Sequence, residues 1–349
     1  MTIALSRRLR STDLRLAVPH SETHSATLLL TALLTYGAVM MLLSGVATGS
    51  LVAVIDLYAP IAFDSVILVA AVTAAICLVS RVSARRMTER FFWLGVGGVM
   101  VWLMLPFFGL FKQLILPHRG FVWDHAFAHV GSSLWGIAPW QITHAVFGST
   151  AGTRFLDDTY DFWMVLMFAF PMAIALLFDN RIVRFRLMVS WFGAWVLIGT
   201  VAAWVFASAG PCYYNALVGP DASYAELQRH LAVIARSAAA EGHPIGTLRF
   251  QTILLKAFRL HEYEPAGGIS AMPSMHVAMA TLMAIAGFCH SRMWGLLMTV
   301  YALLIWIASI HFGWHYFIDG PVAAVMMIGV WKLTAPLATA AYAPPRRHR

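Results

Sequence analysis

The sequence has few charged residues and few cysteines, and each shortage excludes a class of protein. Only 11% of its 349 residues are charged, whereas a soluble domain carries about a quarter. Its three cysteines, Cys77, Cys212 and Cys289, are too few and too scattered for a disulfide framework or a zinc site. No group of carboxylates has metal-ligand spacing, and no internal repeat is visible. A soluble domain and a disulfide-rich domain are therefore excluded, and neither a metal nor a cofactor is expected.

The residues that are abundant are those of an integral membrane protein. Hydrophobic residues make up 60% of the chain, and the mean hydropathy is +0.73. The net charge of +8 does not indicate a nucleic-acid partner, because membrane proteins concentrate Lys and Arg in their cytoplasmic loops. Since about 20 apolar residues cross the hydrocarbon, the sequence predicts an all-α protein with about eight transmembrane helices. These fall at 26–48, 61–80, 91–111, 161–178, 189–208, 272–289, 293–310 and 320–338.

The basic residues predict how these helices are oriented. When eight spans are threaded, the arginine clusters fall on one side of the membrane, at 7–15, 81–90, 181–186 and 346–349. The short loops on the other side contain no Lys or Arg. The positive-inside rule then places both termini in the cytoplasm and the long segments 112–160 and 209–271 on the external face.

The two long external segments are predicted to contain helices that lie in the membrane interface. The first holds Trp123, Trp135 and Trp140, and aromatic residues at this density suit the headgroup layer. The second has a polar, helix-like middle at 222–240 and is long enough to cover the external face as a lid. Within the second predicted span, Asp64 is expected to be a buried carboxylate with a partner near the external end.

A first candidate motif, Pro273-Ser-Met-His276, stands where a loop enters an apolar run. Ser274 can act as the N-cap of the helix, and the free backbone N–H groups of the first turn form an anion site. A phosphate held there would be within reach of His276. Taken alone, His276 could equally cap or pack a helix.

A second candidate motif, His311-Phe-Gly-Trp-His-Tyr-Phe-Ile-Asp319, lies at the edge of another apolar run. His315 and Asp319 are four residues apart, so on a helical turn they share a face and can form a hydrogen bond. A carboxylate on Nδ1–H fixes the imidazole tautomer and leaves Nε2 free as a nucleophile. With His276 as a proton donor, the two histidines make a phosphoryl-transfer pair. The two motifs together favour function over packing.

At these residues the chain resembles the type 2 phosphatidic-acid phosphatase superfamily of membrane lipid phosphatases and phosphotransferases. The family's second block, Pro-Ser-x-His, is matched at 273–276, and the His-x3-Asp of its third block at 315–319. Ser309 stands where the third block has Arg. The first block, Lys-x6-Arg-Pro, is matched by Lys112 and Arg119, with Gly120 in place of its Pro.

The lost Arg, the His-Tyr-Phe-Ile-Asp form of the third block and an upstream Gly-Pro-Cys-Tyr-Tyr are more similar to the branch of inositol phosphorylceramide synthase and sphingomyelin synthase. The resemblance implies that His315 is the nucleophile, Asp319 its orienting partner and His276 the acid. It implies phosphate binding by Ser274, Lys112 and Arg119, with His311 as a substitute for the lost Arg. Tyr213, Tyr214 and Asn215 would either line a headgroup pocket or form a turn.

The sequence thus predicts an extension of two helices at 1–90, a catalytic membrane domain at 91–338 with a six-helix core, and a basic tail at 339–349. The expected activity is transfer of a phospho-headgroup from a phospholipid to a lipid alcohol through a phospho-histidine, on the external face. Hydrolysis of a lipid phosphate or polyprenyl diphosphate is the alternative. A lipid or ion transporter with a histidine proton relay is a more distant one, since only Asp64 suggests it.

Overall fold

The computed structural model of the chain describes residues 18–45, 83–261 and 267–343, with isolated positions between 63 and 74. Every regular element in these ranges is a helix, so the all-α class is confirmed. Six stretches are long and apolar enough to cross a membrane. Four of them are single helices: α2 (His20–Ser44), α8 (Thr150–Leu177), α15 (Arg292–His311) and α16 (Asp319–Ala341). The stretch Arg85–Arg119 comprises α4 (Ala84–Lys112) and α5 (Ile115–Arg119). The stretch Arg181–Val205 comprises α9 (Arg181–Ala194), the π-helix η1 (Trp195–Ala202) and α10 (Ala203–Val205).

Six predicted spans overlap these helices, with boundaries that differ by up to 11 residues, since α8 begins at Thr150 and its predicted span at 161. The short predicted span 272–289 is α14 (Met275–His290), which has 16 residues and is shorter than the other spanning helices. Most of the predicted span 61–80, including Asp64, lies outside the described residues, as do the basic segments at 7–15 and 346–349. Among the described residues, six of the eight predicted spans therefore fall on helices long enough to cross a membrane, and a seventh falls on the shorter α14.

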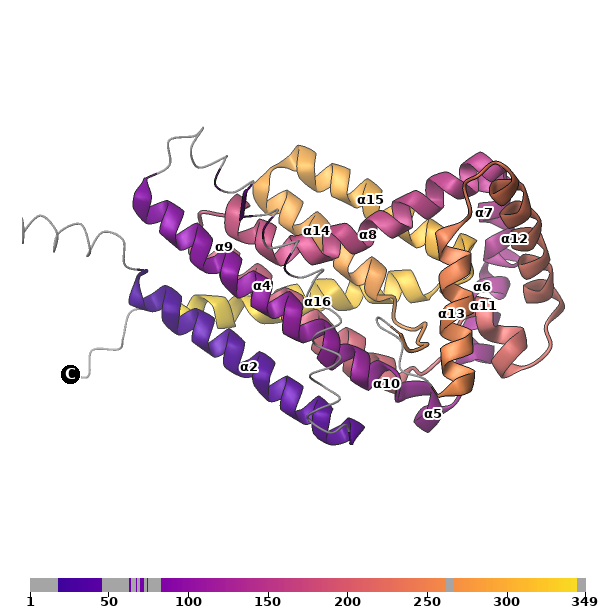
Figure 1. The fold of residues 1–349 in the computed structure, drawn as a ribbon, viewed down its shortest axis with the longest axis horizontal. Helices are drawn as coiled ribbons and strands as arrows, with labels where there is room; N and C mark the ends of the chain where they lie inside the picture. The colour runs from indigo at the N-terminus through magenta and orange to yellow at the C-terminus, as the bar shows by residue number, and fades with distance from the viewer. Residues whose placement is uncertain are drawn as a thin grey trace, which may run out of the picture.

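The long helices lie side by side along one direction, as Figure 1 shows. Gly97 allows α4 to pack closely against α8, because a Cβ at this position would lie 2.8 Å from the Pro171 carbonyl oxygen of α8. Aromatic and aliphatic side chains fill the space between the helices, with Trp93 and Trp191 fully buried. This tight packing holds the ends of α14, α15 and α16 close together.

The two long segments that were predicted to be external contain shorter helices that gather at one end of the bundle (Figure 1). They are α6 (Asp124–Trp135), α7 (Pro139–Phe147), α11 (Pro211–Tyr213), the π-helix η2 (Tyr214–Val218), α12 (Ala222–Ala240) and α13 (Gly246–Leu260). At the start of α12 the Asp221 carboxylate caps the helix, since it accepts a hydrogen bond from Tyr224 N–H at 3.0 Å.

A buried ion pair lies at the other end of the bundle. Arg184 Nη2 and Glu22 Oε1 are 3.0 Å apart, and both side chains are almost fully buried. The other oxygen of Glu22 accepts hydrogen bonds from the Trp93 indole at 2.9 Å and the Tyr342 hydroxyl at 2.7 Å. These contacts of Glu22 join α2 to α4, to α9 and to the end of α16.

Candidate active site

The turn between α15 and α16 places a histidine against a carboxylate. His315 Nδ1–H donates a hydrogen bond to Asp319 Oδ2 at 3.2 Å, and the same oxygen accepts the backbone N–H of Tyr316 at 3.0 Å. Asp319 is the first residue of α16, where the helix dipole stabilises a negative charge. His315 precedes the helix, so the hydrogen bond arises from the turn and not from a shared helical face as the spacing suggested. The bond leaves Nε2 as the free ring nitrogen.

The second histidine, His276, is held at the start of α14. The Ser274 hydroxyl accepts the Val277 N–H at 3.4 Å as the N-cap of this helix. The His276 ring lies between Tyr160 and Trp163 of α8, with ring centroids 4.4 Å and 4.0 Å away. The Trp163 indole donates to the His276 carbonyl at 3.0 Å. These contacts bring the His276 and His315 rings to a centroid distance of 6.3 Å.

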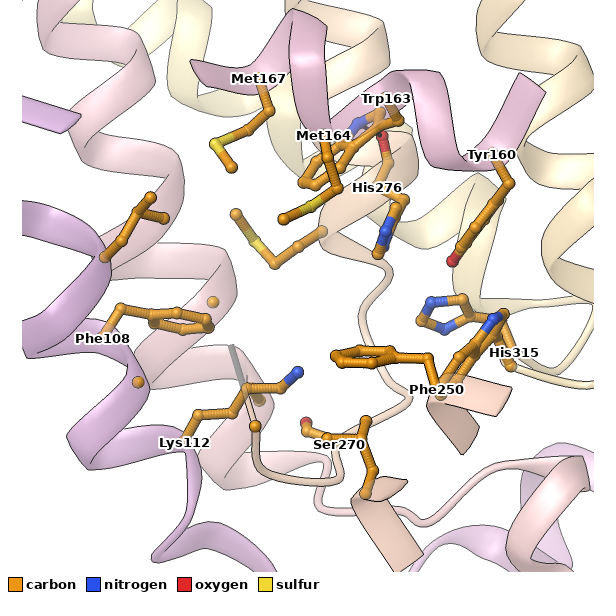
Figure 2. A pocket seen from close by; sticks show the side chains of 18 of the residues that line it. Phe108, Lys112, Tyr160, Trp163, Met164, Met167, Phe250, Ser270, His276 and His315 are labelled. Atoms are coloured by element: carbon orange, nitrogen blue, oxygen red, sulfur yellow. Dashed lines mark hydrogen bonds between the residues drawn. The ribbon is translucent and has the colours of Figure 1, made fainter. Parts of the chain in front are cut away.

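Both histidines line one cavity of about 440 Å³, shown in Figure 2. Lys112 reaches it from the end of α4, and Ser270 from the loop before α14. That loop approaches α4 closely, since Gly268 has a φ of +82° and a Cβ there would lie 2.8 Å from the Lys112 carbonyl carbon. The deeper lining is apolar and includes Phe108, Met164, Met167 and Trp195. A polar group and an apolar chain could therefore bind side by side.

One of the shorter helices at this end of the bundle, α13, forms a wall of this cavity. Gly246, Phe250 and Leu254 of α13, spaced by one helical turn, all line it. The Asp157 carboxylate of α8 accepts the backbone N–H groups of Gly246 at 2.8 Å and Thr247 at 3.0 Å, which fixes the start of α13. The predicted lid is thus an ordered helix that is bonded to α8.

Residues 125–333, more than half of the chain, match the model of the PAP2 superfamily. The chain belongs to this superfamily. No curated protein and no solved structure matches it. Membership brings the superfamily's general chemistry, which is metal-independent phosphatase or phosphotransferase activity on lipid phosphates in a membrane.

The matched region contains His276, His315 and Asp319 and begins after the proposed first block. The structure separates the two residues of that block. Lys112 lines the cavity, whereas Arg119 donates through Nε to the Trp204 carbonyl at 3.1 Å, with its guanidinium 5.9 Å from the Trp204 ring centroid. Arg119 is not among the residues that line the cavity, so the geometry supports only Lys112 as a phosphate ligand of this PAP2 protein.

His311 lies in a different cluster. It is fully buried, its Nε2 is 3.0 Å from Thr153 Oγ1, and its ring stacks on His144 at a centroid distance of 4.1 Å. The His144 Nε2–H donates to the His311 carbonyl at 2.9 Å. Because His311 does not line the cavity, its placement does not support the idea that it replaces the missing arginine of the PAP2 motif.

The segment 213–215 supports the structure around the cavity and does not line it. The Tyr213 hydroxyl donates to the Gln251 carbonyl at 3.1 Å, and the Tyr214 hydroxyl is 2.6 Å from His125 Nδ1. Asn215 Oδ1 accepts the Asp221 N–H at 2.6 Å. Neither sequence reading fits: the segment is helical, at the junction of α11 and η2, and it does not line the cavity.

Sequence reasoning missed most of the residues that surround His276 and His315. Tyr160, Asp161 and Trp163 of α8 line the cavity together with Ser270. The only signal in the sequence was the run of polar residues at 157–161 at the edge of an apolar helix. Asp124 was also missed: it is fully buried, and it connects three segments, as described in the Discussion.

Proposed function

We propose that this PAP2 protein is a lipid phosphotransferase that carries a phospho-headgroup on His315 and delivers it to a second lipid. The observation that carries the proposal is the hydrogen bond of 3.2 Å between His315 and Asp319, made beside His276 at the cavity. A carboxylate on Nδ1 keeps Nε2 unprotonated and therefore nucleophilic. This chemistry is similar to that of the inositol phosphorylceramide synthase and sphingomyelin synthase branch.

The reaction takes place in two steps. In the first, the Nε2 lone pair of His315 attacks phosphorus, the bond from phosphorus to the donor lipid's oxygen breaks, and His276 gives that oxygen a proton. In the second, the oxygen of an acceptor hydroxyl attacks phosphorus, His276 accepts the proton of that hydroxyl, and the phosphorus–nitrogen bond breaks. Both nitrogens return to their starting states.

The phosphoryl charge is met by groups from two helices. Lys112 supplies a cation at the cavity, and the first turn of α14 supplies backbone N–H groups that have no acceptor within the helix. Ser274 contributes indirectly, since its hydroxyl caps this turn and is buried. Electrostatic stabilisation by fixed donors is usually the largest part of such catalysis.

Two features favour transfer over hydrolysis. The cavity is mostly apolar and is covered by α13, which limits access of water to the phospho-histidine. It also contains the carboxylate of Asp161, which would repel a bare phosphate but accept a hydrogen bond from a hydroxyl of an acceptor or headgroup. A lipid-phosphate or polyprenyl-diphosphate phosphatase is the alternative.

The proposal places the active site on the extracytoplasmic side, with both termini in the cytoplasm. Its support is the charge distribution: Arg90, Arg181, Arg184 and Arg186 lie at the end of the bundle opposite the cavity. The catalytic domain would comprise residues 91–338, with 1–90 as an extension and 339–349 as a basic tail.

The test is an assay of purified protein in detergent with a headgroup-labelled phospholipid, with and without a lipid alcohol such as ceramide or diacylglycerol. We expect label on the acceptor, and a loss of at least about a thousandfold in both His315→Ala and Asp319→Asn. His290→Ala, an exposed histidine at the far end of α14, is the matched control. Free phosphate or phospho-headgroup regardless of acceptor would establish the hydrolase instead. Turnover that survives His315→Ala would rule out the phospho-histidine.

A further inference from the structure

Tyr160 is a buried tyrosine whose hydroxyl has no hydrogen-bond partner among the described residues. Its side chain is only 5% exposed, yet it lines the cavity. Buried polar groups are almost always hydrogen-bonded, and an exception at a functional cavity points to a ligand that completes the bond. The ring is fixed by packing, so the hydroxyl is held in place before any substrate binds.

The Tyr160 hydroxyl lies close to the two histidines of the proposed active site. The Tyr160 ring lies nearly parallel to the His276 ring, at 16° and a centroid distance of 4.4 Å. Figure 2 shows its hydroxyl end directed into the cavity, toward the rings of His276 and His315. A phosphoryl group between the two histidines would therefore lie next to this oxygen.

Three other buried tyrosines among the described residues do not share this property. The Tyr36 hydroxyl is 2.8 Å from Thr200 Oγ1, that of Tyr213 donates to a carbonyl at 3.1 Å, and that of Tyr316 donates to Asp124 at 2.7 Å. These three hydroxyls are satisfied within the protein. The Tyr160 hydroxyl is different because the space in front of it is the cavity.

We propose that Tyr160 is a catalytic residue whose hydroxyl donates a hydrogen bond to a non-bridging oxygen of the phosphoryl group as it moves to and from His315. This role rests on the proposed function. The phenol keeps its proton throughout, so no bond of Tyr160 is made or broken. Negative charge builds on the phosphoryl oxygens in the transition state, and a donor that is already oriented stabilises it without reorganisation.

The test is Tyr160→Phe in the full-length purified protein, because this change keeps the stacking ring and removes only the hydroxyl. We expect kcat to fall about 100-fold while KM changes little. Orthovanadate mimics the transition state of phosphoryl transfer, and its affinity for the variant, measured by titration calorimetry, should fall by a similar factor. The thermal midpoint should stay within a few degrees of that of the wild type.

The matched control is Tyr301→Phe, whose hydroxyl donates at 3.3 Å to the carbonyl of Thr159, the residue next to Tyr160. It should leave kcat and vanadate affinity unchanged. Wild-type values of both in Tyr160→Phe would overturn the role of Tyr160. Vanadate binding requires no lipid turnover, so this result remains distinct from a failure of the proposed function, which would appear as full activity in His315→Ala.

Discussion

The carboxylate of Asp124 accepts a hydrogen bond of 2.7 Å from the hydroxyl of Tyr316, the residue that follows His315. The same carboxylate accepts the backbone N–H groups of Ala209 at 2.9 Å and Gly210 at 3.0 Å. One buried side chain of α6 thus joins the segment after α10 to the turn that carries the proposed nucleophile.

Removal of this carboxylate should destabilise the end of the bundle that carries the cavity. Asp124→Ala leaves two buried backbone N–H groups and the Tyr316 hydroxyl unpaired, so we expect a loss of about 3 kcal/mol in unfolding free energy. Tyr316→Phe removes one hydrogen bond and should cost about 1 kcal/mol. Denaturant unfolding in detergent measures both. Asp158→Ala, an exposed carboxylate on α8, is the control, and an equal loss there would contradict the role of Asp124.

The two basic residues of the resembled first block should behave differently. Lys112 lines the cavity, so Lys112→Gln should lower kcat/KM for the lipid donor about 100-fold. Arg119→Gln should change kcat/KM by less than about threefold, because its guanidinium contacts Trp204. Steady-state kinetics of both variants measures this contrast. A larger effect at Arg119 than at Lys112 would show that Arg119 contacts the phosphate once the lipid donor is bound.

Stability should depend on pH through His144. Burial lowers the pKa of His144 below its usual value of 6.5, and the hydrogen bond to the His311 carbonyl only partly offsets this. Because the folded chain disfavours the charged imidazole, unfolding takes up a proton below about pH 6.5, and stability falls as the pH falls from there.

His144→Gln removes the titrating group and retains a donor for the His311 carbonyl. We expect the thermal midpoint of this variant to fall less between pH 7 and pH 5 than that of the wild type. His243→Gln, an exposed histidine, should keep the wild-type profile. Parallel profiles for all three proteins would show that His144 makes no contribution.

The buried ion pair at the far end should matter more than a surface pair. Glu22→Gln leaves the guanidinium of Arg184 buried without a countercharge and should cost about 3–5 kcal/mol. Glu89→Gln breaks the exposed pair with Arg85, whose atoms are 3.3 Å apart, and should cost about 0–1 kcal/mol. Unfolding in detergent compares the two. Similar losses would mean that α2 is not held to the bundle by Glu22.

Much of the architecture could be predicted because the signals are local. Each apolar run of about 20 residues implies a spanning helix whatever surrounds it, and α2, α8 and α15 appear where such runs were found. The pairing of His315 with Asp319 was also within reach, since the two lie four residues apart. The reason given for it was wrong, because a turn makes the contact and not a helix.

The missed parts depend on which helix faces meet. Tyr160 approaches His276 because α8 packs against α14, although 116 positions separate them in the chain. Arg119 turns to Trp204 and His311 to His144 through tertiary contacts that motif spacing does not encode. The motifs in the sequence named Arg119 and His311 but not their neighbours, and they did not name Tyr160.

The length of α16 has a consequence for the lipids themselves. Asp319 begins this helix of 23 residues, and Tyr342, which follows its end, contacts Glu22 about 35 Å away from the cavity. Donor and product headgroups would therefore meet His315 in a single leaflet. If the proposed transfer takes place, an acceptor made in the opposite leaflet has to cross the bilayer before it can react.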